Sequence, residues 1–153
     1  MSTKQDLYNQ CVQLVDARFK SIQRHISDIQ NSLLSETKSS AGDKHETGRA
    51  MLQLEREKAG RQLAEINKLR TALSKINIEK KPTLVGLGSL VYTSKAHYFI
   101  AVSIGALKGG DNSFYAISPS TPIGELLMGK TVGDEVSFNA FKPCIHKLDT
   151  LVI

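Results

Sequence analysis

Residues 12–33 read VQLVDARFKSIQRHISDIQNSL, and their apolar positions recur alternately at three and four residues. This spacing is typical of a heptad seam, in which one face of a helix packs against a partner helix. From Tyr8 onward the sequence therefore predicts a long helix of the coiled-coil type. The members of its predicted seam are Val12, Val15, Phe19, Ile22, Ile26, Ile29 and Leu33.

A second apolar stripe follows, with spacings of seven, four and three residues, and it predicts a second long helix. Two helices of roughly 30 residues, each about 45 Å long, are most simply joined as an antiparallel hairpin, because each then buries the other's stripe. We assign this hairpin to residues 1–78; pairing of residues 8–33 between two chains is the alternative. The predicted second stripe consists of Leu52, Ala59, Leu63, Ile66, Leu69, Leu73 and Ile76.

The predicted tip of the hairpin, residues 39–46, reads SSAGDKHE and sets Asp43 and Glu46 three residues apart. One interpretation is a capping box, which stabilises the start of the second helix. The other is a pair of carboxylates presented to Mg²⁺, which prefers oxygen ligands but needs about six of them. His45 lies between the two acids and is either a further ligand or proton carrier, or simply an exposed side chain.

The composition changes at residues 79–83, a charged segment that contains Pro82 and is predicted to link two domains. Residues 84–153 favour strands and contain one short helix, with Thr121 as its N-cap and Pro122 at its first position. The predicted fold is therefore α+β: an N-terminal antiparallel coiled-coil hairpin, then a small antiparallel sheet domain with one helix. The predicted strands are residues 84–93, 97–104, 113–118, 136–141 and 145–152.

The net charge of +5 lies entirely in residues 1–81, so the predicted rod is basic. A basic rod attracts polyanions such as nucleic acid, although lysine and arginine also simply solvate the outer faces of coiled coils. We expect a cytoplasmic protein without membrane contact, because the sequence has no apolar run long enough for a membrane helix and no signal segment. Cys11 and Cys144 stand alone, and no catalytic pattern indicates an autonomous enzyme or a small-molecule substrate.

Three segments of the second domain, TPI at 121–123, LLMGK at 126–130 and VGDEV at 132–136, resemble a family signature. It is the C-terminal signature of the Gre-family transcript cleavage factors of bacterial RNA polymerase. Residues 42–46, with the pattern Gly-Asp-x-x-Glu, resemble the tip of that family's hairpin. The order of the two domains also agrees, so the resemblance covers nearly the whole chain.

The resemblance implies that the hairpin enters the secondary channel of bacterial RNA polymerase and that an FKBP-like domain docks at the channel entrance. It implies that Asp43 and Glu46 are the catalytic and metal-binding residues, holding Mg²⁺ jointly with the polymerase rather than tightly alone. The polymerase would cut the backtracked RNA, and this chain would meet the nascent RNA only indirectly. Thr121, Pro122 and Ile123 are the implied docking residues.

Two alternatives remain open. After Glu46 the chain reads TGRAM at residues 47–51, where the family usually continues with an Asn-Ala-Glu-Tyr type of sequence. A channel regulator that does not assist cleavage, or that inhibits synthesis, is therefore the first alternative. The second is a coiled-coil adaptor, or an isomerase or chaperone built on the FKBP-like domain, although 6% aromatic residues and no Trp supply few side chains for such a pocket.

Overall fold

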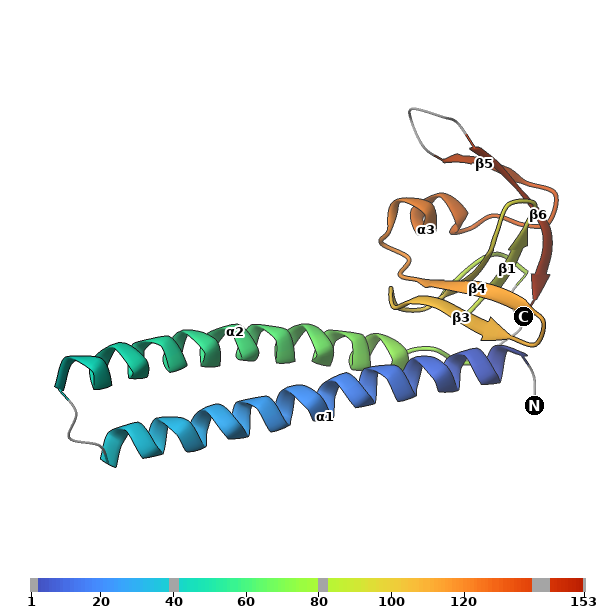
Figure 1. The fold of residues 1–153 in the computed structure, drawn as a ribbon. Coiled ribbons are helices and arrows are strands. Elements are labelled where there is room, and N and C mark those ends of the chain that lie inside the picture. The colour runs from blue at the N-terminus through green and yellow to red at the C-terminus, as the bar shows by residue number, and fades with distance from the viewer. Residues whose placement is uncertain (1–2, 39–41, 80–82, 139–143, 153) are drawn as a thin grey trace. The chain divides into compact units, whose positions relative to one another are not determined.

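The computed structural model describes residues 3–38, 42–79, 83–138 and 144–152, and omits the side chains of residues 36–46 and 138–152. Two long helices come first, followed by six strands and one short helix (Figure 1). The chain forms two compact units, of which the first combines residues 1–13 with residues 72–153 and the second contains residues 14–71. We call the second unit the hairpin shaft and residues 83–152 the sheet domain.

The predicted hairpin is confirmed: helix α1 spans Thr3–Lys38 and helix α2 spans Gly42–Ser74, and they lie side by side in Figure 1. Within the hairpin shaft, predicted seam residues from both helices form one buried apolar cluster. The seam therefore pairs the two helices of one chain. The cluster contains Ile22, Ile26, Ile29 and Ala59, with Leu33, Leu52, Leu63 and Ile66 packed against it.

One predicted seam position is wrong. Val12 is 39% exposed, whereas Leu7 and Cys11 are 0% exposed and Val15 is 1% exposed. These three buried residues are four apart, which keeps them on one face of α1, whereas Val12 lies about 100° further around the helix. The burial of Cys11 raises the pKa of its thiol to about 12.

The first residues of α1 and the last residues of α2 belong to the same compact unit as the strands. The hydroxyl of Tyr8 donates a hydrogen bond to the Leu73 carbonyl at 3.2 Å, and the Gln10 amide donates one to the Lys108 carbonyl at 2.7 Å. The base of the helix pair is thus tied into the unit that contains the strands.

Among the described residues, six strands form the sheet in the order β3-β4-β2-β1-β6-β5. The antiparallel sheet expected from the sequence is mixed instead, because β2 and β4 pair in parallel, with Tyr98 opposite Tyr115. In the chain, β3 lies between β2 and β4; it pairs antiparallel with β4, and β4 runs in the same direction as β2. The strands are β1 Leu90–Thr93, β2 His97–Ile100, β3 Gly105–Gly109, β4 Asn112–Ile117, β5 Glu135–Phe138 and β6 Cys144–Val152.

The first predicted strand, residues 84–93, begins only at Leu90. Gly88 precedes it with a φ of +89°, a left-handed conformation that interrupts an extended strand and that glycine adopts readily. The amide of Gly88 donates a hydrogen bond to the Ile100 carbonyl at 2.6 Å, so this segment still follows the neighbouring strand.

Helix α3 spans Pro122–Leu127 and starts as predicted, with the side chain of Thr121 accepting a hydrogen bond from the Gly124 amide at 3.1 Å. Two of its residues, Ile123 and Leu127, enter the apolar core against the sheet. The helix ends before Gly129, whose φ is +78°. The rest of this core consists of Val85, Val91, Tyr98, Ile100 and Val136.

Candidate functional site

Asp43 and Glu46, the predicted catalytic pair, lie in the first two turns of α2, because this helix begins at Gly42 and not after Glu46. A capping box requires Asp43 to precede the helix, whereas here the helix starts one residue earlier. Residues three apart on a helix are neighbours on its surface, and the positive end of the helix dipole favours carboxylates there. The side chains of both acids and of His45 lie outside the described residues, so their predicted roles stay predictions.

The hairpin shaft holds the start of α2 beside the last turns of α1. Close to this end of the shaft, the guanidinium of Arg49 on α2 donates a hydrogen bond to the Leu33 carbonyl on α1 at 3.2 Å. This bond joins two residues that are 16 apart in sequence and ties the two helices together near the acids. The sequence gives no sign of this bond between Arg49 and the Leu33 carbonyl, since no spacing rule links an arginine to a carbonyl of another helix.

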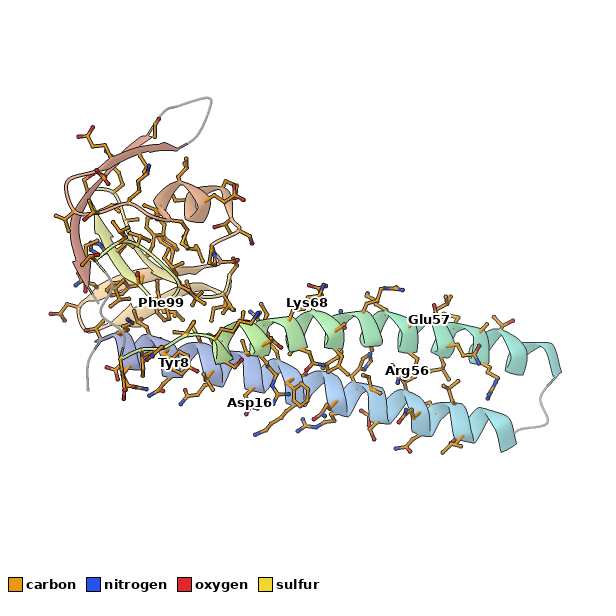
Figure 2. The ribbon with its side chains drawn as sticks, turned by 180° about the vertical axis from the view of Figure 1, so that it is seen from behind. Tyr8, Asp16, Arg56, Glu57, Lys68 and Phe99 are labelled. Carbon is orange, nitrogen blue, oxygen red and sulfur yellow. The ribbon has the colours of Figure 1, made fainter. Side chains whose placement is uncertain are left out.

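Further along the shaft, the Arg70 guanidinium lies 4.1 Å from the centre of the Phe19 ring, a cation–π contact across the two helices. Two ion pairs among the described side chains of the shaft are local: Lys20 meets Asp16 at 3.2 Å and Lys68 meets Glu65 at 3.0 Å. Figure 2 labels one member of each pair, Asp16 and Lys68. All four of these charged side chains are well exposed, so each pair adds little stability, and the seam supplies most of the attraction between the helices.

A magnesium ion would find few ligands on this chain alone. Two carboxylates are fewer than the six oxygens that Mg²⁺ prefers, and water would have to supply the rest. No cluster of three or more His, Cys, Asp or Glu side chains that could hold a metal occurs in the part of the chain that is described. Asp43 and Glu46 have no described side chains, so magnesium binding by them stays a prediction.

The three predicted docking residues have different environments in the sheet domain. Ile123 is 8% exposed and belongs to the core, and the hydroxyl of Thr121 is occupied by hydrogen bonds to Gly124 and Ser118. Pro122 is exposed. Only Pro122 of this group therefore presents a largely free surface, while the other two position the helix.

Exposed apolar side chains that the sequence analysis did not select lie close to α3 in the chain. Leu126, Met128 and Val132 are 38%, 37% and 53% exposed, and Leu84 is 50% exposed. Backbone hydrogen bonds join the segments that carry them: the Val85 amide donates to the Lys130 carbonyl, and the Val85 carbonyl accepts from the Gly129 amide. Contiguous exposed apolar side chains are typical of contact surfaces, and these neighbouring segments supply candidates for one.

His97, to which the sequence assigns no chemistry, packs against Tyr92 and Phe114 with ring centres 4.7 and 5.6 Å away, and these two rings also contact each other. Its Nδ1 atom is buried and has no hydrogen-bond partner among the described residues.

Among the residues that the structure describes, no helix is long and apolar enough to span a membrane.

No family model matches the chain, and no curated protein matches it either. Among solved structures, the transcription factor Gfh1 aligns over 94% of this chain and 92% of its own, with 18% identity and a TM-score of 0.38. Gfh1, or GreA factor homolog 1, of Thermus thermophilus aligns over 94% and 93% with 18% identity and a TM-score of 0.35. Gfh1 of Thermus aquaticus aligns over 90% and 95% with 21% identity and a TM-score of 0.34. At these TM-scores the similarity carries no argument about function.

Proposed function

We propose that this chain is a transcription elongation factor that inserts its hairpin into the secondary channel of bacterial RNA polymerase and stimulates the polymerase's own cleavage of backtracked RNA. The observation that carries the proposal is the position of Asp43 and Glu46 at the start of α2, at the joined end of two long paired helices. A helix of 36 residues is about 54 Å long, which is enough to carry a side chain deep into a narrow channel.

The two carboxylates would act by completing a metal site that the polymerase supplies in part. Bound Mg²⁺ lowers the pKa of a coordinated water and stabilises a leaving oxygen. Asp43 and Glu46 would hold the ion next to the backtracked RNA, and the Arg49 bond to Leu33 would keep the end of the hairpin in one conformation. The chain itself would catalyse no reaction in the absence of polymerase.

The sheet domain would dock at the channel entrance. Pro122 is the exposed member of the predicted docking residues, and the exposed side chains of Leu126, Met128 and Val132 add apolar surface close to it in the chain. Truncation of such side chains in a protein interface weakens binding when they are fully covered by the partner.

The proposal is tested with a purified backtracked elongation complex that carries end-labelled RNA. The parent chain should yield shortened RNA, and the double variant Asp43→Ala with Glu46→Ala should lose at least tenfold in cleavage rate. Asp28→Ala with Glu57→Ala is the matched control, because both acids are exposed on the shaft, and it should cleave as the parent does. Absence of shortened RNA with the parent, or equal rates for the two double variants, contradicts the proposal.

A regulator that occupies the channel without assisting cleavage is the second candidate. It is favoured by residues 47–51, where Gly48 and Arg49 replace the sequence usual in cleavage factors. In the same elongation complex this candidate gives no shortened RNA and a slower rate of nucleotide addition. Binding of the chain to core polymerase, measured by gel filtration, is expected for both candidates.

A further inference from the structure

The hairpin shaft carries a groove between α1 and α2 with a volume of about 920 Å³. It extends over residues 14–25 of α1 and residues 58–69 of α2, which corresponds to about three helical turns or about 16 Å. In Figure 2 this stretch runs from Asp16 and Lys68 toward Arg56. The apolar residues that line it are Leu14, Ala17, Ile22, Ile66 and Leu69.

Much of this apolar lining is accessible to water. Leu14 is 41% exposed and Ala17 is exposed, while Ile66 and Leu69 are only half-buried. Contact of apolar side chains with water is unfavourable, and exposed apolar surface bordered by charges is typical of a binding site.

The rim of the groove is basic. Arg18 from α1 and Lys58 and Arg61 from α2 line it, and in the described ranges none of the three has a carboxylate within ion-pair distance. The one acid among the lining residues that are described, Glu65, is already paired with Lys68 at 3.0 Å. The groove therefore offers three cations around an apolar floor, none of them paired with a carboxylate among the described side chains.

We propose that this groove binds an acidic amphipathic α-helix of a partner protein. Such a helix places apolar side chains at positions i, i+3, i+4 and i+7 into an apolar groove. Acidic side chains on either side of that stripe would meet Arg18 on one rim and Lys58 and Arg61 on the other, where charge-assisted hydrogen bonds form.

Two other occupants fit less well. A second copy of this chain brings the same basic rim, and like charges across an interface oppose binding. A single-stranded nucleic acid matches the cations through its phosphates but leaves the apolar floor without an apolar partner. Binding of such a helix requires no polymerase and is measured on the chain alone, whereas cleavage is measured on an elongation complex. Either result can therefore fail without the other.

The test uses the full chain and a fluorescein-labelled peptide of about 18 residues, which is long enough to become helical. The peptide has leucines at the four stripe positions and glutamates beside them, and fluorescence anisotropy follows its binding. We expect saturable binding, and at least tenfold weaker binding of the same peptide with lysine in place of glutamate. Amide NMR shift changes should concentrate in residues 14–25 and 58–69.

Variants of the rim identify the site. Arg61→Glu should weaken binding of the acidic peptide at least tenfold, because it reverses one rim charge at an exposed position. Arg24→Glu, at an exposed position of α1 that does not line the groove, is the matched control and should stay within twofold of the parent. Leu14→Gln should weaken binding about fivefold, and circular dichroism checks that each variant keeps the helices.

Several outcomes overturn the proposal. The first is the absence of saturable binding of the acidic peptide, or equal binding of the acidic and basic peptides. The second is equal loss with Arg61→Glu and Arg24→Glu. The third is tighter binding of a single-stranded RNA of similar length than of the peptide, and the fourth is a dimer in analytical ultracentrifugation that Arg61→Glu dissociates.

Discussion

In the sheet domain, Phe99 and Phe114 are 0% exposed, whereas in the hairpin shaft Met51 and Leu54 are 61% and 64% exposed. The difference follows from the number of surfaces that each architecture offers. One face of the sheet packs on α3, and Phe99 lies in β2 between two residues of that core, so its side chain points to the opposite face of the sheet. This strand unit also contains the first residues of α1, and a sheet that is buried on both faces can surround a large side chain on all sides. Two paired helices share only one face, and apolar side chains away from that face remain in water.

Because of this difference, side chains of the sheet core mainly determine stability, whereas most side chains of the shaft are available for binding. The shaft depends on a single stripe in which Ile29 and Ala59 are 3% and 1% exposed, and most of its remaining surface is free for contacts. Changes in the sheet core should therefore unfold a domain, while most changes on the shaft should alter binding and leave stability almost unchanged.

The largest effect is expected from Phe99→Ala. Removal of a fully buried phenylalanine from a core lowers the free energy of unfolding by about 3–5 kcal/mol. Urea unfolding followed by near-ultraviolet circular dichroism of the tyrosines measures this loss, because the chain has no Trp. Tyr115→Ala is the control, since Tyr115 is 49% exposed, and it should lose less than about 1 kcal/mol. Similar losses would contradict the enclosed core.

Next in size is Ile29→Ala, which should lower the free energy of unfolding of the hairpin by about 2–4 kcal/mol because it opens a cavity in the seam. Its partner variant, Leu54→Ala, should change stability by no more than about 0.5 kcal/mol. Thermal unfolding at the helical circular dichroism band compares the two. If Leu54→Ala were as damaging as Ile29→Ala, the single-stripe description of the shaft would be wrong.

A smaller effect is expected at Gly124 in α3. A Cβ atom there would overlap the Ser118 carbonyl oxygen and lie 2.7 Å from the Thr121 hydroxyl, so Gly124→Ala should lower stability by about 1–3 kcal/mol. Gly86→Ala is the matched control, since a Cβ at Gly86 meets nothing within 4 Å. Urea midpoints compare the two variants, and a neutral Gly124→Ala would show that the start of α3 can shift.

The smallest effect concerns the base of α1. Burial raises the pKa of Cys11 from 9.0 to about 12, so between these values the folded state keeps a proton that the unfolded state loses. Stability should therefore be unaffected by this thiol below about pH 9 and fall as the pH rises toward 12, by about 1 kcal/mol between pH 8 and pH 10.

Urea midpoints of the parent and of Cys11→Ala at pH 8 and pH 10 measure the contribution of this thiol. Lysines and tyrosines titrate in both proteins, so only the difference between the two slopes reports on Cys11. A parent that loses no more stability than Cys11→Ala over this range would mean that the thiol is accessible to water.

The hairpin was predictable because its signal is local: the heptad spacing of residues 15–33 specifies a buried stripe without reference to the rest of the fold. The error in its seam arose where two apolar residues are adjacent. Cys11 and Val12 both continue the pattern, by steps of four and three from Val15, and only the packing at the base selects Cys11.

The sheet was predicted less well, for two physical reasons. Strand β3 reads GALKG, with glycines at both ends, and neither its composition nor its alternation distinguishes it from a loop. The parallel pairing of β2 with β4 joins residues that are distant in sequence and leaves no local pattern. By contrast, the start of α3 was predicted because Thr121 and Pro122 act on the adjacent backbone.

For the candidate site, the spacing of Asp43 and Glu46 together with the resemblance of residues 42–46 to the Gre-family tip selected the two acids, but the remaining features required the assembled structure. The bond from Arg49 to the Leu33 carbonyl and the basic rim formed by Arg18 and Arg61 each bring together residues of different helices. Such pairs share no repeat in the sequence, so periodicity does not reveal them.

Strand β6 has a consequence for biosynthesis. It pairs with β1 on one side and with β5 on the other, although it is the last strand along the chain. A ribosome releases residues 14–71 well before residues 144–152, so the helices can pair while the sheet still lacks the strand that connects β1 to β5. Nascent chains stalled before residue 144 should therefore show protease-resistant helices beside an unfinished sheet that is open to chaperones.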